Sequence, residues 1–119
     1  MQLTALDKEL HDRMLISQIL KYQNEDFVVV AANHEGWPTP EKVGNCVPDI
    51  IAQRRGHIIF NEVETCSTII LKETRIQCEE IVKEGQLEIT IPYTCYYTAR
   101  STFSDWGIPV ARWWRYAGP

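Results

Sequence analysis

Three acidic side chains stand in a part of the chain that is otherwise apolar. Asp49 follows Pro48, and Glu62 and Glu64 stand two residues apart in the stretch IIFNEVET. A carboxylate is costly to bury unless another group compensates its charge. Carboxylate oxygens are also the ligands that Mg²⁺ and Mn²⁺ prefer, and such an ion can stabilise the charge that builds up in phosphodiester hydrolysis. Metal-assisted phosphodiester chemistry is therefore the first hypothesis for these residues.

The three acids meet only if neighbouring strands position them. Residues 47–53 and 57–65 are rich in apolar and β-branched residues, and the short turn between them predicts an antiparallel hairpin. Because alternate residues of a strand share a face, Glu62 and Glu64 project together, and Asp49 falls opposite them. The structural alternative is that the acids of an edge strand simply face water.

The other elements follow from apolar periodicity and from Gly and Pro. Thr4 and Asp7 resemble a capping box, and Gly85 and Gly107 end two later helices. The first helix is expected to bury a stripe made of Leu6, Leu10, Met14 and Ile19 or Leu20. The predicted helices are 4–22, 67–83 and 94–105, and the predicted strands are 26–32, 47–53, 57–65, 86–91 and 108–116.

This order of elements, α-β-β-β-α-β-α-β, predicts an α/β fold. We expect a mixed sheet of about five strands with helices on both faces. The first strand, 26–32, is short and apolar, so we expect it to be buried. The length of 119 residues suffices for a single domain, 1–119.

The acidic motif then resembles that of a known family. Pro48-Asp49, followed after a hairpin by Glu62-Val63-Glu64, is similar to the PD-(D/E)xK nuclease superfamily, which includes restriction endonucleases and Holliday-junction resolvases. The resemblance covers about 4–91, where the order of elements matches the αβββαβ core of that superfamily, and the last helix and strand resemble a C-terminal extension. It implies a restriction-endonuclease-like fold, with Mg²⁺- or Mn²⁺-dependent hydrolysis of DNA. By the resemblance, Asp49, Glu62 and the Val63 carbonyl ligate the metal.

Glu64 stands where this superfamily usually has lysine. Some of its restriction endonucleases carry glutamate there and are active, so the resemblance implies that Glu64 is a second metal ligand or a general base. Two alternatives stay open. The basic role has moved to Lys72 on the following helix, or catalysis has been lost and the protein is an inactive nuclease-fold module that binds protein or nucleic acid. Gln77, on the same helix, stands where the family often has a polar residue that lines the cleft.

Other polar residues are weaker candidates for the same site. Glu9 and Asp12 stand on the first helix, where some family members place an additional acidic ligand, although exposed helix charges are the ordinary interpretation. His34 and Glu35 lie in the loop before Asp49, and loops of this kind often carry function. They are candidates for contact with substrate or a second metal.

Two groups of residues have both structural and functional interpretations. Thr65, Ser67 and Thr68 follow the glutamates directly, so we expect them to cap the next helix or to border the site. Trp113 and Trp114 are adjacent in the last strand, so one should be buried and the other exposed. An exposed Trp flanked by arginines favours a subunit interface, and hence a homodimer, over a platform for stacking bases.

Composition limits the classes of protein that remain. The net charge of −4 counts against tight non-specific DNA binding, but it leaves room for a metal-assisted contact with phosphate. No run of 18 apolar residues exists, and the N-terminal stretch carries acids where a signal peptide has a basic start, so we expect a cytoplasmic protein without a membrane span. In that compartment cysteines stay reduced, and we expect free thiols, with a disulfide or a zinc site as the alternatives, at Cys46, Cys66, Cys78 and Cys95.

Overall fold

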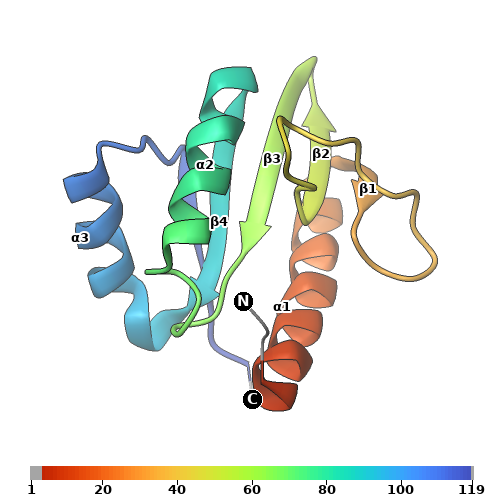
Figure 1. Ribbon diagram of the computed structural model, residues 1–119. Coiled ribbons are helices and arrows are strands. Elements are labelled where there is room, and N and C mark those ends of the chain that lie inside the picture. Colours follow the sequence, from red (N-terminus) through yellow and green to blue (C-terminus); the bar gives the residue numbers. More distant parts are fainter. Residues whose placement is uncertain (1–3, 119) are drawn as a thin grey trace.

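The structure is a computed structural model, and it describes residues 4–118 (Figure 1). The elements follow one another in the predicted order, with one short 3₁₀ helix, η1, added before the last α-helix. They are α1 (Ala5–Asn24), β1 (Val28–Ala32), β2 (Ile50–Arg54), β3 (His57–Val63), α2 (Lys72–Glu84), β4 (Gln86–Pro92), η1 (Tyr93–Cys95), α3 (Tyr96–Trp106) and β5 (Arg112–Tyr116).

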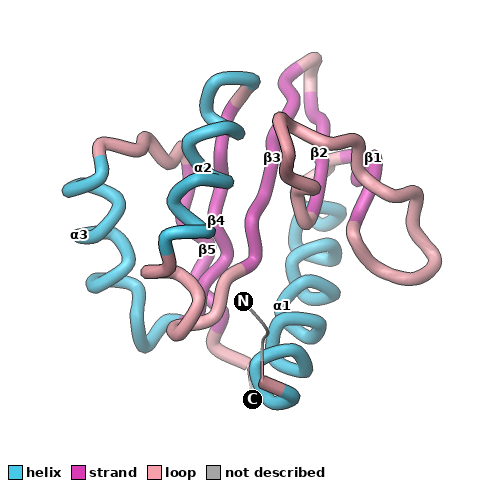
Figure 2. The backbone as a smooth tube through the Cα atoms, in the orientation of Figure 1, coloured by secondary structure: helices cyan, strands magenta, loops and turns pink. Residues whose placement is uncertain are grey.

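The strands form one mixed open sheet of five strands, as predicted, and their order in the sheet is β1-β2-β3-β4-β5. β2 pairs antiparallel with β1 and with β3, and β3, β4 and β5 run parallel. The β2–β3 hairpin turns at Arg55 and Gly56, whose φ angles are both positive, 53° and 81°. A tight turn of this hand matches the twist of the two strands. α1 covers one face of the sheet, and α2 and α3 cover the other (Figures 1 and 2).

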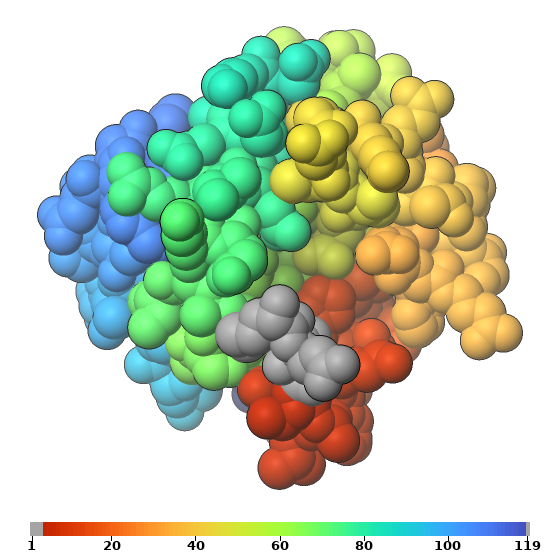
Figure 3. Space-filling model, viewed as in Figure 1, coloured from red at the N-terminus to blue at the C-terminus, as the bar shows by residue number. Residues whose placement is uncertain are grey.

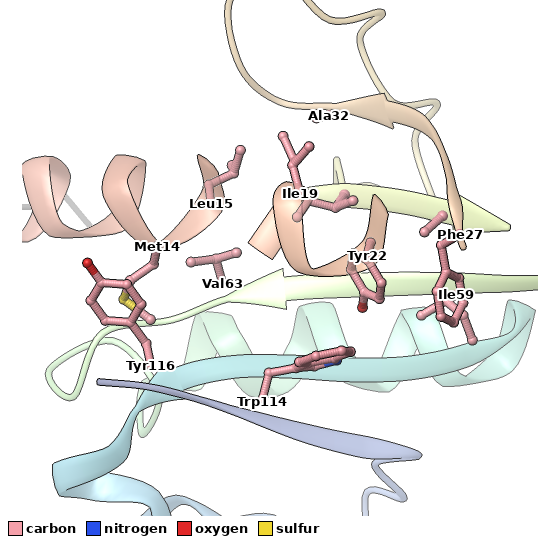
Figure 4. Close-up of a cluster of buried hydrophobic side chains, with 12 residues drawn as sticks. Met14, Leu15, Ile19, Tyr22, Phe27, Ala32, Ile59, Val63, Trp114 and Tyr116 are labelled. Carbon is pink, nitrogen blue, oxygen red and sulfur yellow. The ribbon is translucent and has the colours of Figure 1, made fainter. Parts of the chain in front are cut away.

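A hydrophobic core lies under α1. Met14, Leu15, Ile19 and Tyr22 point from the helix toward strand residues of β1, β2, β3 and β5 (Figure 4). Met14 and Ile19 were predicted correctly, and the Thr4 side chain caps α1 by accepting a hydrogen bond from the Asp7 N–H. The predicted stripe was wrong at its first residue, because Leu6 is 78% exposed, and of the alternatives Ile19 and Leu20 it is Ile19 that is buried. The buried face of α1 also includes Leu15 and Tyr22, which the predicted stripe left out.

The α1 face of the sheet also buries a polar network. Glu88 on β4 is 5% exposed and accepts hydrogen bonds from the Tyr22 hydroxyl (2.8 Å) and from the Trp114 indole N–H (2.7 Å). Burial, together with the charge of Glu88, raises the pKa of Tyr22. Neither tryptophan of the last strand is exposed, because Trp114 is buried and Trp113 packs edge-on against Phe103. The exposed Trp that favoured a homodimer is therefore absent from residues 4–118.

The prediction that the first strand is buried was wrong. β1 forms an edge of the sheet, and its Val28 and Val30 side chains are exposed. Only its α1-facing end, at Ala31 and Ala32, is buried. Apolar β-branched residues predict a strand, but not whether a helix covers both of its faces.

Two of the four cysteines are paired, which corrects the expectation of four free thiols. Cys66 and Cys95 form a disulfide, whereas Cys46 and Cys78 are free and buried. The disulfide joins the segment that follows β3 to η1, which follows β4. No helix within residues 4–118 has the length and apolar character needed to cross a lipid bilayer.

Candidate functional site

The end of the β2–β3 hairpin positions Asp49. The last paired residues of the two strands there are Ile50 and Asn61, and Asp49 directly precedes this pair. Its Oδ2 atom accepts a hydrogen bond from the Val63 N–H at 2.8 Å, so the carboxylate continues the ladder in place of a backbone carbonyl. Asp49 is therefore fixed against β3 and is only 8% exposed.

Glu62 and Glu64 lie on the strand beside Asp49. Glu62 belongs to β3, and the Glu64 N–H donates to the Thr90 carbonyl (2.9 Å), which extends the β3–β4 pairing beyond the end of β3. The two side chains are 3% and 7% exposed. Together with Asp49 they line one cleft of about 350 Å³, so the structure brings the three predicted carboxylates together.

Three structural segments surround this cleft. α1, the loop 33–49 and α2 meet on the face of the molecule seen in Figure 3, where they are red, orange to yellow, and green to cyan. The end of β3 supplies the floor. The cleft therefore needs elements from both faces of the sheet.

Burial and mutual repulsion change the proton affinity of the acids. Burial raises the pKa of Glu62 well above its ordinary value, and the charges of Asp49 and Glu64 raise it further. Burial also raises the pKa of Glu64 to about 7, although a hydrogen bond from Thr68 opposes this. The Oε1 atom of Glu62 is buried without a hydrogen-bond partner among residues 4–118. A buried carboxylate of this kind is costly, so it requires either a proton or a cation.

His11 is a cleft residue that sequence reasoning missed. It lies on α1, and its Nε2 atom is 3.3 Å from Asp49 Oδ1. Burial lowers the pKa of His11, but the hydrogen bond and charge of Asp49 outweigh this, and the pKa rises to about 8. The sequence feature that could have revealed His11 is its position four residues before Leu15, which is buried, because residues with this spacing lie on the same side of a helix.

The acidic candidates on α1 do not line the cleft. Glu9 is exposed and pairs with Arg13 (3.2 Å), and Asp12 Oδ1 lies 3.7 Å from the other ring nitrogen of His11. The structure therefore agrees with the interpretation of Glu9 as an exposed charge on the helix surface.

Hydroxyl groups hold Glu64 from the segment that follows it. Thr68 Oγ1 donates to Glu64 Oε2 at 2.6 Å, and the Thr65 N–H donates to Thr68 Oγ1 at 2.9 Å. These threonines border the site but do not cap α2, because that helix begins at Lys72 with Leu71 at its N-cap. The prediction that the helix begins at Ser67 was wrong because residues 65–71 form turns instead.

The remaining candidates divide between the cleft and its surroundings. Gln77 lines the cleft, whereas Lys72 is exposed at the start of α2 and does not. His34 and Glu35 line a separate, neighbouring cleft, which shares Asn33 with the acidic one. Of the described residues that line the acidic cleft, His11 is the only basic one.

Within the described part of the chain, no group of three or more His, Cys, Asp and Glu side chains is already arranged to hold a metal ion. Comparisons of the chain with family models, with curated protein sequences and with solved structures found no match.

Proposed function

We propose that this protein has a restriction-endonuclease-like fold and is a divalent-metal-dependent nuclease that hydrolyses phosphodiester bonds in DNA. Asp49, Glu62 and the Val63 carbonyl are the proposed ligands, and Glu64 is a further ligand or the general base. A bound Mg²⁺ or Mn²⁺ would neutralise charge on the phosphate and lower the pKa of a water molecule. The order of elements, α-β-β-β-α-β, supports the assignment to this fold.

One observation carries the proposal: the buried, unpartnered Oε1 atom of Glu62, in a cleft with two other carboxylates. A proton on Glu62, donated to Asp49, would remove the charge of that one side chain, but the repulsion between Asp49 and Glu64 would remain. A divalent cation accepts lone pairs from several carboxylates at once and removes their repulsion. The donor set, which consists of oxygen atoms, fits Mg²⁺ or Mn²⁺ better than a soft metal.

The neighbouring residues have supporting roles in this proposal. His11 holds Asp49 through its Nε2 atom, and the Val63 N–H fixes the other oxygen of the same carboxylate. Thr68 orients Glu64, and Gln77 lines the wall of the cleft. Ligands that are held by such outer contacts keep their orientation when a metal binds.

The test combines metal binding with cleavage. Calorimetric titration with Mn²⁺ should show binding, and supercoiled plasmid should be nicked in the presence of Mg²⁺. Glu62→Gln keeps the shape of the side chain but removes its charge. It should weaken Mn²⁺ binding by more than the roughly 10- to 100-fold that is typical of losing an outer-shell partner, and it should abolish nicking. Glu84→Gln, at the exposed end of α2, is the matched control and should change neither. Nicking by Glu62→Gln at the wild-type rate would contradict the proposal.

A second candidate function is a non-catalytic nuclease-fold module that binds protein or nucleic acid. The location of Lys72 outside the cleft favours it, because the cleft then lacks the basic residue that the superfamily usually places there. This candidate predicts that Mn²⁺ binds and that Glu62→Gln removes the binding, but that no plasmid is nicked by either protein.

A further inference from the structure

The disulfide lies beside the acidic cleft. Cys66 follows Glu64 by two residues, and its partner Cys95 belongs to η1 at the end of β4. The segment that follows β3 and the segment that follows β4 meet at the same end of the sheet, at the lower edge of Figure 1. The cross-link therefore ties the turns of residues 65–71 to a neighbouring element close to the carboxylates.

These turns orient Glu64. The Thr68 hydroxyl that donates to Glu64 also receives the Thr65 N–H, so its position depends on the backbone around Cys66. The backbone hydrogen bonds of the Thr68 and Ile69 N–H groups both return to the Thr65 carbonyl, inside the same turn. They define the shape of the turn but do not attach it to the sheet.

Other contacts fix the turn to the rest of the molecule. The Ile69 side chain is buried in the core under α2, and Ser67 Oγ donates to Asp7 Oδ2 at 3.2 Å on the surface. The Cys66–Cys95 disulfide is the covalent attachment, and it is next to Thr65 in the chain. Opening it should let the first half of the turn, at Thr65 and Cys66, move. Ile69 and the Thr74 hydroxyl, which donates to the Thr68 carbonyl at 2.6 Å, keep the second half in place.

We propose that the redox state of the Cys66–Cys95 pair regulates the affinity of the acidic cleft for divalent cations. The oxidised pair keeps the Thr65 N–H against the Thr68 hydroxyl, which orients that hydroxyl toward Glu64 and keeps the cleft competent to bind a cation. The reduced pair releases the Thr65 N–H and weakens that binding. This inference rests on the proposed metal-dependent function. The chemical partner is a thiol or phosphine reductant, and the regulated group is the carboxylate cluster of Asp49, Glu62 and Glu64.

Reduction of the Cys66–Cys95 disulfide follows ordinary thiol–disulfide exchange. A dithiol reductant attacks one sulfur of the pair, the S–S bond breaks, and two cysteine thiols form with two protons. The dithiol loses two electrons and closes its own disulfide, whereas a phosphine gives the same two cysteine thiols by taking an oxygen atom from water and becoming the phosphine oxide. Cys66 is exposed, so attack there needs no unfolding. Cys46 and Cys78 are buried, and burial raises the pKa of both thiols, which keeps them out of the exchange.

The experiment measures the Mn²⁺ affinity of the oxidised protein and of the protein reduced with a phosphine, with circular dichroism showing that both are folded. We expect the reduced protein to bind Mn²⁺ about 10-fold more weakly, since Thr68 acts as an outer contact of a ligand. The Cys66→Ser/Cys95→Ser double variant should match the reduced protein and should not respond to the phosphine. Cys46→Ala, which lacks only a free thiol, should respond like the wild type.

A second measurement separates failure of this inference from failure of the proposed function. Amide hydrogen exchange of residues 65–71 in metal-free protein should become faster on reduction. If oxidised protein binds no Mn²⁺, the proposed function fails, and regulation of metal affinity fails with it, whatever the exchange rates. If oxidised and reduced protein bind Mn²⁺ equally, or exchange at 65–71 is unchanged by reduction, the redox inference is overturned while the proposed function stands.

Discussion

Glu64 and His11 bind protons more tightly in the folded protein than their residue types ordinarily do. Burial raises the pKa of Glu64 from 4.5 to about 7, and Asp49 raises that of His11 from 6.5 to about 8. The free energy that Glu64 gains by holding its proton is complete below pH 4.5 and is lost as the pH rises toward 7. The contribution of His11 is complete below pH 6.5 and is lost as the pH rises through 8. The two residues therefore act in the same direction.

We predict that the free energy of unfolding of the metal-free protein falls as the pH rises from 5 to 7, by roughly 3 kcal/mol at most from Glu64. Urea unfolding at a series of pH values measures this. Glu64→Gln has no proton to lose, so the part of the pH dependence that comes from Glu64 should disappear, while the part from Glu62, whose pKa burial also raises, should remain. Glu84→Gln should behave like the wild type. A Glu64→Gln variant with the wild-type pH dependence would show that Glu64 does not titrate as inferred.

The residues of the site differ in how far a sequence can reveal them. Asp49, Glu62 and Glu64 share a cleft because of strand alternation and a short hairpin, and both are visible in the local sequence. His11 reaches Asp49 because α1 passes the open end of the β2–β3 pair. No local pattern states where a helix crosses a sheet, so this contact depends on tertiary packing. For the same reason, the location of Lys72 outside the cleft could not be read from its spacing to Glu64.

At the scale of elements, the segment between β3 and α2 orients the side chain of Glu64. Residues 65–71 delay the start of α2 and place the Thr68 hydroxyl 2.6 Å from Glu64. Thr74 secures this arrangement from the first turn of α2, because its hydroxyl donates to the Thr68 carbonyl at 2.6 Å. The turn and α2 together therefore fix the orientation of the Glu64 carboxylate.

Thr68→Val tests the hydrogen bond between Thr68 and Glu64, because it keeps the shape of the side chain and removes the hydroxyl. The hydrogen bond from Thr68 lowers the pKa of Glu64, so the variant should raise that pKa above about 7, as followed by NMR titration of the Glu64 carboxyl carbon. At pH 8 the lost bond to a charged group should reduce the free energy of unfolding by about 1.5 to 3 kcal/mol. Thr68→Ser retains the donor and should behave like the wild type. Equal titration curves for the Val and Ser variants would show that the hydroxyl does not bond Glu64 in solution.

Element order could be predicted because Gly, Pro and apolar periodicity mark where elements begin and end. Gly107 illustrates this: its φ of 70° is a left-handed conformation that ends α3 where the sequence predicts a stop. Burial was harder to predict. Val28 and Val30 read as core residues but lie exposed on an edge strand, and the start of α2 depends on hydroxyl contacts across the turn. The exposure of the two valines depends on which elements pack against β1, and the start of α2 depends on local side-chain hydrogen bonds that apolar periodicity does not report.

At the scale of the whole molecule, both faces of the sheet hold a hydrophobic core, and the two faces differ in the polar groups that they bury. The α1 face holds a core with a buried hydrogen-bonded Glu88, and the side chains of Glu62 and Glu64 end in the acidic cleft beside α2. The disulfide joins the ends of β3 and β4, which are parallel neighbours. It closes a loop that contains the whole of α2 and β4, so it constrains a large part of the unfolded chain.

This loop sets the expected cost of reduction. The paired cysteines are 29 residues apart, and closing a loop of that size lowers the chain entropy of the unfolded state, which corresponds to about 3 to 4 kcal/mol of stability. We therefore expect reduction, or the Cys66→Ser/Cys95→Ser double variant, to lower the free energy of unfolding by about that amount, as measured by urea denaturation. Cys46→Ala is the control for reduction, because it should lose the same further stability as the wild type when the phosphine is added. A loss below about 1 kcal/mol would contradict this entropic account, because it would mean that residual structure in the unfolded chain, or strain in the native cross-link, offsets the advantage of closing the loop.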